Sequence, residues 1–229
     1  MVKPPSVPAP IRSFPRAGCG QLPMTAGSRR TTVVREREAK PEAAMPGVLI
    51  VYASTHGHTA KIAARTARGL EDRGAAAHVC DVASAAELAP PDFDAVIVGA
   101  SVHNGHHQRD IVAWARRHAT AMSMMPSAFF SVCLTAADDT DEARQATRNY
   151  LDDFEDQTGW TPRMTVSFAG ALQYREYDFA TRLVMRLLMS RRHHPTDVTQ
   201  DYDYTDWEAV DRFADDLSHM VADAVPATG

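Results

Sequence analysis

The fold is decided by the stretch VLIVYASTHGHT at residues 48–59. Its first six residues form an unbroken apolar run, which is typical of a strand that is covered on both faces. The last six supply three hydroxyl groups and one glycine, and the residues that follow, up to Arg73, are rich in helix-favouring Ala, Lys, Arg and Leu. We therefore expect a buried strand, a short loop and a helix in direct succession.

Apolar runs alternate with helical patterns from this stretch to the end of the chain. Further strands are expected at 77–82, 95–100, 128–135 and 164–169, and helices at 59–73, 109–121, 139–157, 178–191 and 205–224. Such alternation predicts parallel strands joined by right-handed crossovers. The expected fold is α/β, a doubly wound five-stranded parallel sheet in the order 2-1-3-4-5 with helices on both faces. Ligands bind such a sheet at the carboxyl ends of its strands.

Charge is distributed unevenly along the 229 residues, whose formal net charge is −5. Residues 1–44 contain eight Lys or Arg and three Glu, so the rest of the chain carries a net charge of −10. A body this acidic lacks the clustered cations that contacts to phosphate groups require. The composition therefore argues against nucleic acid as a partner.

Cysteine usage and hydropathy favour a cytoplasmic location. Cys19, Cys80 and Cys133 lie far apart, with neither the spacing of a metal site nor that of a disulfide framework. This usage fits a reducing compartment. The sequence contains no run of about 18 apolar residues, so no membrane-spanning helix is expected.

The first 46 residues differ in composition from the rest. They are rich in Pro, Arg, Ser and Gly and lack amphipathic periodicity. We interpret residues 1–46 as a disordered extension, or as the result of a misassigned start with Met45 as the natural initiator. They also lack the apolar central region of a secretory signal. The folded domain is expected at 47–225.

The loop after the first strand has the composition of a phosphate site. Hydroxyl groups, a glycine and the unpaired N–H groups of a helix N-terminus can surround an anion. The loop contains no lysine and matches neither GxxxxGK[ST] nor GxGxxG, so a monophosphate fits better than a nucleoside triphosphate or a dinucleotide. An ordinary helix cap without a ligand remains the alternative. The candidate ligands are Ser54, Thr55, His56, Gly57, His58 and Thr59.

Residues 50–59, followed by Ala63, resemble the FMN signature of the flavodoxin family. Two aliphatic residues, an aromatic residue, a hydroxyl, a small residue and a threonine follow in the family's order. His56 stands where flavodoxins commonly have another threonine, and Thr66 takes a position that is usually aliphatic. The resemblance implies a flavodoxin-like domain with FMN as its cofactor.

The same resemblance implies that the loops after the later strands border the flavin. The candidates are Ser101, Val102, His103, Asn104 and Gly105, then Thr135 and Ala136, then Gly170, Ala171, Leu172 and Tyr174. The neighbouring histidines, His103, His106, His107 and His118, raise the alternatives of a metal site and of donors or proton relays beside a flavin. No Cys or acidic residue completes a ligand set, so no metal is expected.

Three later stretches are more specific. Residues 126–132 (PSAFFSV), 168–174 (FAGALQY) and 204–207 (YTDW) resemble the flavodoxin-like protoporphyrinogen oxidases that are linked to menaquinone. Together the resemblance covers about residues 48–217 and is weakest at 138–159 and 191–201. It implies that the chain oxidises protoporphyrinogen IX to protoporphyrin IX in haem biosynthesis and passes the electrons from FMN to a quinone.

The expected helix 178–191 is amphipathic and rich in arginine. Such a helix can lie on anionic lipid or contact a dicarboxylate, so Arg182 and Arg186 are candidate substrate ligands, and peripheral contact with the inner face of the cell membrane is an expectation. The alternative is a helix packed on the sheet with solvated arginines. A homo-oligomer is compatible with the sequence, which assigns no catalytic residue.

Two other functions compete with this interpretation. A non-enzymatic flavodoxin would use its acidic surface to meet basic reductases, but it would usually be a shorter chain. An NAD(P)H:quinone reductase would need a nucleotide site, for which no fingerprint is visible.

Overall fold

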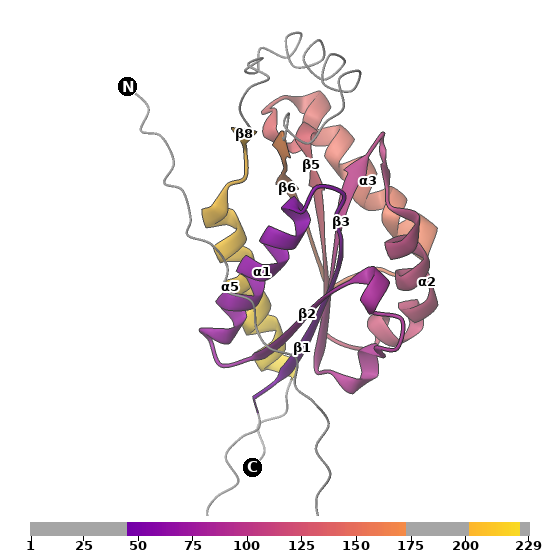
Figure 1. Ribbon diagram of the computed structural model, residues 1–229, viewed down its shortest axis with the longest axis vertical. Helices are drawn as coiled ribbons and strands as arrows, with labels where there is room; N and C mark the ends of the chain where they lie inside the picture. Colours follow the sequence, from indigo (N-terminus) through magenta and orange to yellow (C-terminus); the bar gives the residue numbers. More distant parts are fainter. Residues whose placement is uncertain (1–44, 173–201, 225–229) are drawn as a thin grey trace, which may run out of the picture. The chain divides into compact units, whose positions relative to one another are not determined.

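The computed structural model describes residues 45–172 and 202–224 (Figure 1). The described elements are β1 (Gly47–Ala53), α1 (His58–Glu71), β2 (Ala76–Asp81), the 3-10 helices η1 (Val82–Ser84) and η2 (Pro90–Asp92), β3 (Ala95–His103), β4 (His106–His107), α2 (Arg109–Ser123), β5 (Ser127–Cys133), the 3-10 helix η3 (Leu134–Ala137), α3 (Asp141–Thr158), β6 (Met164–Ala169), β7 (Ala171–Leu172), β8 (Tyr202–Asp203) and α5 (Trp207–Ala224). Residues 1–44, Tyr174, Arg182, Arg186 and the expected helix 178–191 lie outside the described residues.

Five parallel strands form the central sheet in the order β2-β1-β3-β5-β6. This confirms the predicted order 2-1-3-4-5, because β4 is an additional two-residue strand that lies off this path and pairs antiparallel with β3. All five strands run in one direction, so their carboxyl ends share one edge of the sheet, at the top in Figure 1. The loops proposed from the sequence follow β1, β3, β5 and β6 at that edge.

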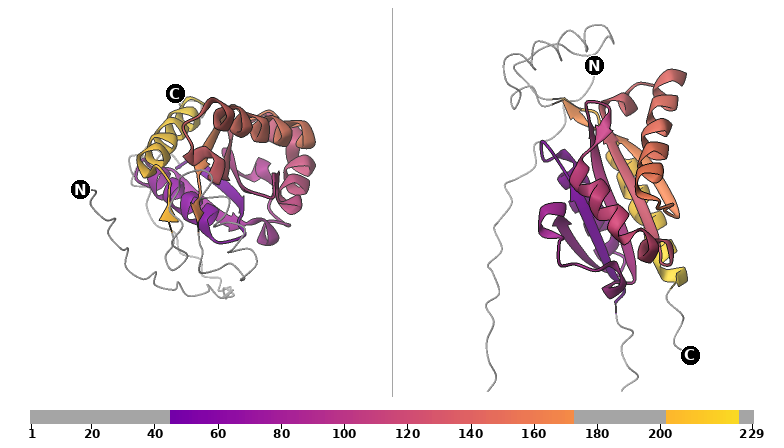
Figure 2. Two further views of the ribbon diagram at one scale, coloured as in Figure 1. Left: turned by 90° about the horizontal axis from the view of Figure 1, so that it is seen from above. Right: turned by 90° about the vertical axis from the view of Figure 1, so that its right-hand side faces the viewer.

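Helices cover both faces of the sheet, as expected. One face packs against α1 and α5 through a core that includes Ile50, Leu70 and Phe213, and the other against α2 and α3 through Val98 and Phe154. Viewed along the strands, the sheet lies between these two layers (Figure 2). None of the helices within residues 45–172 and 202–224 combines the length and the apolar composition that a membrane-spanning helix needs.

The helices α1 and α5 approach each other closely. A Cβ built at Gly69 would lie 2.6 Å from the Cβ of Ala214, so the glycine permits this separation. On the solvent side, the Arg65 guanidinium donates two hydrogen bonds of 2.6 Å to the Asp211 carboxylate. Because α1 begins directly after the first loop, α5 supports the helix on which that loop rests.

Some element boundaries differ from the sequence prediction. The fourth predicted strand, 128–135, ends at Cys133, because η3 turns the chain there. The next helix begins at Asp141 rather than at 139, because the Thr140 side chain caps it, and the last helix begins at Trp207 rather than at 205. The third strand continues past the predicted end at 100 to His103 and then pairs with β4.

Candidate functional site

The first loop, residues 54–57, joins β1 to α1 at the carboxyl edge. Gly57 precedes the first helical residue with φ +75°, and a Cβ built there would meet no atom within 4 Å. A φ of +75° lies in the left-handed region of backbone conformation, where a residue with a side chain would be strained whatever space is available, so this position favours glycine. The chain thus turns directly into α1 with an unobstructed surface at the turn.

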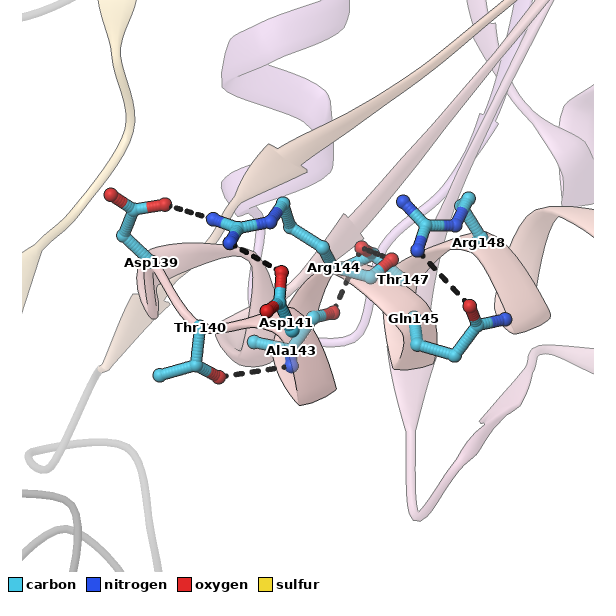
Figure 3. Close-up of polar contacts among 8 residues, drawn as sticks. All are labelled: Asp139, Thr140, Asp141, Ala143, Arg144, Gln145, Thr147 and Arg148. Atoms are coloured by element: carbon cyan, nitrogen blue, oxygen red, sulfur yellow. Dashed lines mark hydrogen bonds and ion pairs between the residues drawn. The ribbon is translucent and has the colours of Figure 1, made fainter.

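The N-terminus of α1 differs from those of the other described α-helices. No side-chain hydrogen bond caps it, and its first turn contains no acidic residue, whereas the first turns of α2, α3 and α5 each contain at least one acidic residue. The contrast with α3 is plain in Figure 3, where the Thr140 hydroxyl accepts from the N–H of Ala143 at 3.1 Å and Arg144 pairs with Asp139 and Asp141. Among the described α-helices, α1 is the one that lacks both a side-chain cap and an acidic residue in its first turn, so its N-terminal N–H groups and positive dipole end are available to an anion.

Thr59 and His58 lie in the first turn of α1, but they are placed differently. Thr59 is 1% exposed, and its hydroxyl has no hydrogen-bond partner among the described residues. His58 is also buried, but its Nε2 lies 2.6 Å from the hydroxyl of Thr205, just before α5. The first turn therefore presents a buried hydroxyl without a partner, and the imidazole holds the turn to the C-terminal segment.

The second loop is a β-hairpin rather than an irregular loop. Asn104 and Gly105 have φ of +50° and +82°, and Val102 and His103 pair antiparallel with His107 and His106. Two successive residues with positive φ are typical of the two-residue turns that match the twist of a hairpin, and Asn-Gly is their preferred sequence. The candidate residues 101–105 therefore form the end of β3 and the tip of this hairpin.

His107 anchors the hairpin in the core. Its Nε2 lies 2.9 Å from the hydroxyl of Ser131, and its ring contacts Phe129 and Phe154 edge-on at centroid distances of 5.4 and 5.2 Å. Burial lowers its pKa to about 4. His118, another of the histidines considered above, packs its ring against Trp114 in α2 with the ring centroids 4.7 Å apart. His107 and His118 therefore pack against aromatic side chains, and neither ring offers a hydrogen bond to a ligand at the loops.

Side chains connect the first and second loops. The amide nitrogen of Gln108 donates to the hydroxyls of Ser101 at 2.6 Å and Thr55 at 3.2 Å, so one side chain spans both loops. The rings of His56 and His103 are 6.4 Å apart and meet edge-on. The structure thus brings the two predicted sets of residues together at one place. No group of three or more potential metal ligands occurs within 45–172 and 202–224.

The third loop forms the 3-10 helix η3, which contains Thr135 and Ala136. Burial raises the pKa of the Cys133 thiol just before it, and the backbone of Ala136 and Thr135 acts in the opposite direction. Thr135 and Ala136 are both half-buried at the carboxyl edge.

The fourth loop is tied to β5 and to the C-terminal segment. The Gly170 N–H donates to the Cys133 carbonyl at 3.2 Å, and the Gly170 carbonyl accepts from the N–H of Tyr204 at 3.3 Å. Ala171 and Leu172 form β7, which pairs antiparallel with β8. These residues lie at the same edge as the first two loops.

The family model of the flavodoxin domain matches residues 49–199. The chain belongs to the flavodoxin family. The match begins within β1, so it includes the first loop and the hairpin. Among solved structures, oxidised Flavodoxin 1 from Bacillus cereus is 15% identical, with a TM-score of 0.47 over 76% of this chain and 97% of its own.

Two curated relatives of this flavodoxin-family chain share one name. The Leishmania major protein named protoporphyrinogen IX dehydrogenase [quinone] is 37% identical over 176 residues, which are 76% of this chain and 76% of that protein. A protein of the same name from Escherichia coli K12 is 34% identical over 172 residues, which are 75% of this chain and 94% of that protein. Both are named as oxidoreductases with a quinone acceptor.

The residues of the first loop fit the flavin cofactor that the family implies. The unpartnered buried hydroxyl of Thr59, the uncapped start of α1 and the glycine turn supply donors and space for a phosphate. The hairpin lies beside this loop, since the Gln108 amide joins Ser101 to Thr55. An edge with these two parts can hold a redox nucleotide by its phosphate and leave its ring at the loops.

Two features of this site were not predicted from the sequence. Gln108 directly follows the histidine run and precedes α2, and this position after a strand of the carboxyl edge was the available signal. The pairing of His58 with Thr205 joins residues 147 positions apart, and no local pattern predicts such a contact. Thr205 lay within the YTDW stretch that carried the family resemblance, without a role assigned to it.

Proposed function

We propose that this protein binds FMN and oxidises protoporphyrinogen IX to protoporphyrin IX, with a quinone as electron acceptor. The observation that carries the proposal is the 34–37% identity, over three quarters of the chain, to proteins named for this reaction. The geometry of the carboxyl edge supports it, because the start of α1 suits a monophosphate. FMN, unlike FAD, ends in such a group.

The phosphate would lie at the first loop. Ser54, Thr55 and Thr59 would donate their hydroxyls, the His56–Gly57 segment its backbone, and the N–H groups at His58 and Thr59 would add the helix dipole. Hydrogen bonds to an ionised phosphate are about twice as strong as neutral ones. The loop therefore needs no lysine to hold a dianion.

The flavin ring would lie between the hairpin and the fourth loop. Ser101, fixed by Gln108, and the tip His103–Gly105 would border one side, and Gly170–Leu172 the other. FMN supplies two-electron chemistry when bound. The protein's part is to hold the ring, keep the hairpin rigid through His107, and admit the planar substrate from the open edge.

Substrate and membrane contacts remain proposals that rest on residues outside those described. Arg182 and Arg186 would pair with the two propionates of the porphyrinogen, and Tyr174 would stack on a planar ring. The acceptor would be menaquinone, and the protein would work in the cytoplasm at the inner face of the membrane, where such an apolar quinone is found. Replacing Arg182 and Arg186 by alanine should raise the substrate KM or weaken binding to anionic vesicles.

The test uses the purified, FMN-loaded protein. Porphyrin fluorescence should appear when protoporphyrinogen IX and a menaquinone analogue are supplied without oxygen, and mass spectrometry of the released cofactor should identify FMN. Consumption of NAD(P)H with the quinone, or reduction of the flavin without porphyrin formation, would instead support a reductase or an electron carrier. A protein that binds no flavin at all would contradict the proposal.

A further inference from the structure

His58 is placed between the proposed phosphate site and the C-terminal segment. It is the first residue of α1 and only 6% exposed. Its Nε2 lies 2.6 Å from the Thr205 hydroxyl and 3.6 Å from a carboxylate oxygen of Asp203 in β8. The Trp207 ring covers it edge-on at 5.9 Å. The imidazole thus contacts the C-terminal segment, and its backbone begins α1 directly after the first loop.

The hydrogen bonds around Thr205 determine which nitrogen of His58 carries the proton. The single hydroxyl hydrogen of Thr205 is donated to the Ala169 carbonyl at 2.9 Å, because a carbonyl can only accept. Nε2 of His58 must therefore donate to the Thr205 oxygen. In the neutral ring, Nδ1 then carries a lone pair, and this buried atom has no hydrogen-bond partner among the described residues.

The charged groups near His58 oppose one another. Burial, the largest influence, lowers its pKa, the Asp203 carboxylate acts to raise it, and Lys61 one turn along α1 lowers it further. The Ala169 carbonyl at the end of β6 reaches His58 through the Thr205 hydroxyl, and from α5 the Trp207 indole, which carries no charge, packs on the ring. The balance leaves a neutral ring beside a carboxylate, with one buried nitrogen that is able to accept a proton.

A dianionic phosphate at the start of α1 would change this balance, because an opposite charge within a few ångströms favours the charged form of an imidazole. We propose that His58 takes up one proton from solvent at Nδ1 when the FMN phosphate binds, and that the resulting imidazolium forms an ion pair with Asp203. Nε2 keeps its own proton and its bond to Thr205. The inference rests on the proposed FMN function and adds to it the ionisation of a residue in the cofactor site.

The same step would couple the cofactor to β8. The Asp203 carboxylate already accepts from the N–H of Thr205 at 3.0 Å and from the Trp207 indole at 3.3 Å, and β8 pairs with β7. An imidazolium would add a charged partner to this cluster. Loading the phosphate site would therefore fasten the β7–β8 pair to the first turn of α1, and, by reciprocity, Asp203 would tighten FMN binding.

The experiment is calorimetric titration of the flavin-free protein with FMN at about pH 7.5, where the free phosphate is already mainly dianionic. Titrations in two buffers with different ionisation enthalpies give the number of protons taken up. We expect about half a proton or more per FMN. Between the His58 pKa values of the free and loaded protein, the Kd should rise with pH, by up to about tenfold per pH unit.

Variants locate the proton. His58→Gln should bind FMN with no proton uptake and with little pH dependence of the Kd above about pH 7, because the amide can still donate to Thr205 but cannot ionise. Asp203→Asn should bind FMN with reduced uptake, because the partner carboxylate is gone. His78→Gln, a histidine on β2 outside the site, should leave the uptake unchanged.

Histidine NMR of the unaltered protein provides a measurement that needs no variant. The His58 resonance should titrate at a higher pH in the loaded than in the free protein, with Nδ1 becoming protonated on loading. FMN binding without proton uptake, or a His58 ring that stays neutral at the same pH in both forms, would overturn the inference while leaving the proposed function intact. Absence of FMN binding would instead contradict the proposed function.

Discussion

The first loop and the hairpin reach the same edge of the sheet but are held there in different ways. The first loop turns at a glycine and leads into the uncapped start of α1, where the buried Thr59 hydroxyl has no hydrogen-bond partner among the described residues. The hairpin is fastened by the His107–Ser131 pair beneath it and by its Asn-Gly turn. One region leaves its donors available, and the other uses its polar groups to fix its own shape.

Because of this difference, changes in one region should affect binding and changes in the other should affect folding. Unused buried donors have a favourable role only when a ligand is present, because an unsatisfied buried polar group lowers stability. Polar pairs that are already satisfied contribute to the folded state itself. Substitutions in the first loop should therefore weaken cofactor binding, and substitutions in the hairpin should lower the free energy of unfolding.

The largest effect is expected for His107→Ala. The change would leave a cavity between Phe129 and Phe154 and an unpaired Ser131 hydroxyl, so the free energy of unfolding should fall by about 3 kcal/mol. Denaturant titration followed by circular dichroism measures this. His106→Ala, at the exposed neighbouring position of the same two-residue strand, should change stability by less than about 0.5 kcal/mol. Equal losses in the two variants would show that His107 does not anchor the hairpin.

The same residue predicts a pH dependence of stability. Burial holds the pKa of His107 at about 4 in the folded protein, against 6.5 for an ordinary histidine, so the unfolded chain binds the proton first as the pH falls. The contribution of the neutral His107 ring to the free energy of unfolding should be complete above pH 6.5. It should be lost progressively as the pH falls toward 4, by about 3 kcal/mol in total. His107→Gln keeps a partner for Ser131 but does not ionise. Its unfolding free energy should therefore decline less over this range, and parallel curves for the two proteins would refute the prediction.

A smaller effect, on the affinity for FMN rather than on stability, is expected in the first turn of α1. Thr59→Val removes the unpartnered hydroxyl, and the Kd for FMN should rise by a factor of about thirty, since a hydrogen bond to a charged group contributes about 2 kcal/mol. Thr66→Val is the matched control, because Thr66 is equally buried two turns along α1 and its hydroxyl also lacks a partner among the described residues. An unchanged Kd for Thr59→Val would place the phosphate elsewhere.

A further test concerns the tip of the hairpin. Gly105→Ala forces a side chain into a residue with φ +82°, which should cost about 1 kcal/mol of unfolding free energy. Gly47→Ala is the control, because its Cβ would meet Asp94 and Phe93 at the ordinary distance of 3.8 Å. Thermal unfolding of both variants measures the difference, and equal melting temperatures would count against a strained turn.

The smallest effect is expected for the pair of Arg65 and Asp211 between α1 and α5. Both side chains are nearly half exposed, so solvent screens their attraction despite the bidentate geometry. A double-mutant cycle with alanine should give a coupling of less than about 1 kcal/mol. A much larger coupling would mean that this pair, and not the buried α1–α5 contact, supports the first loop.

The sequence predicted what local patterns and crossover rules control. The parallel sheet and both helical layers followed from the alternation of apolar runs and helical patterns, and the strand order is the one that flavodoxin-like sheets of five strands adopt. The carboxyl edge as the place of the site followed from the loop after residue 53. The boundaries near 134 and 139 were missed, because a 3-10 turn and a threonine cap outweighed the apolar pattern there. The anchoring role of His107 was missed because burial between Phe129 and Phe154 depends on long-range packing, and the His58–Thr205 contact for the same reason.

The proposed function requires that the first loop and the hairpin hold a flavin that removes electrons from a porphyrinogen. Its most direct test is to mix the FMN-loaded protein with protoporphyrinogen IX without oxygen or quinone, and to follow flavin absorbance and porphyrin fluorescence together. Because the conversion releases six electrons and each flavin takes up two, about three flavins should bleach per porphyrin formed when the protein is in excess, and added menaquinone should restore the flavin colour. A flavin that keeps its colour in the presence of protoporphyrinogen IX would contradict the proposed function.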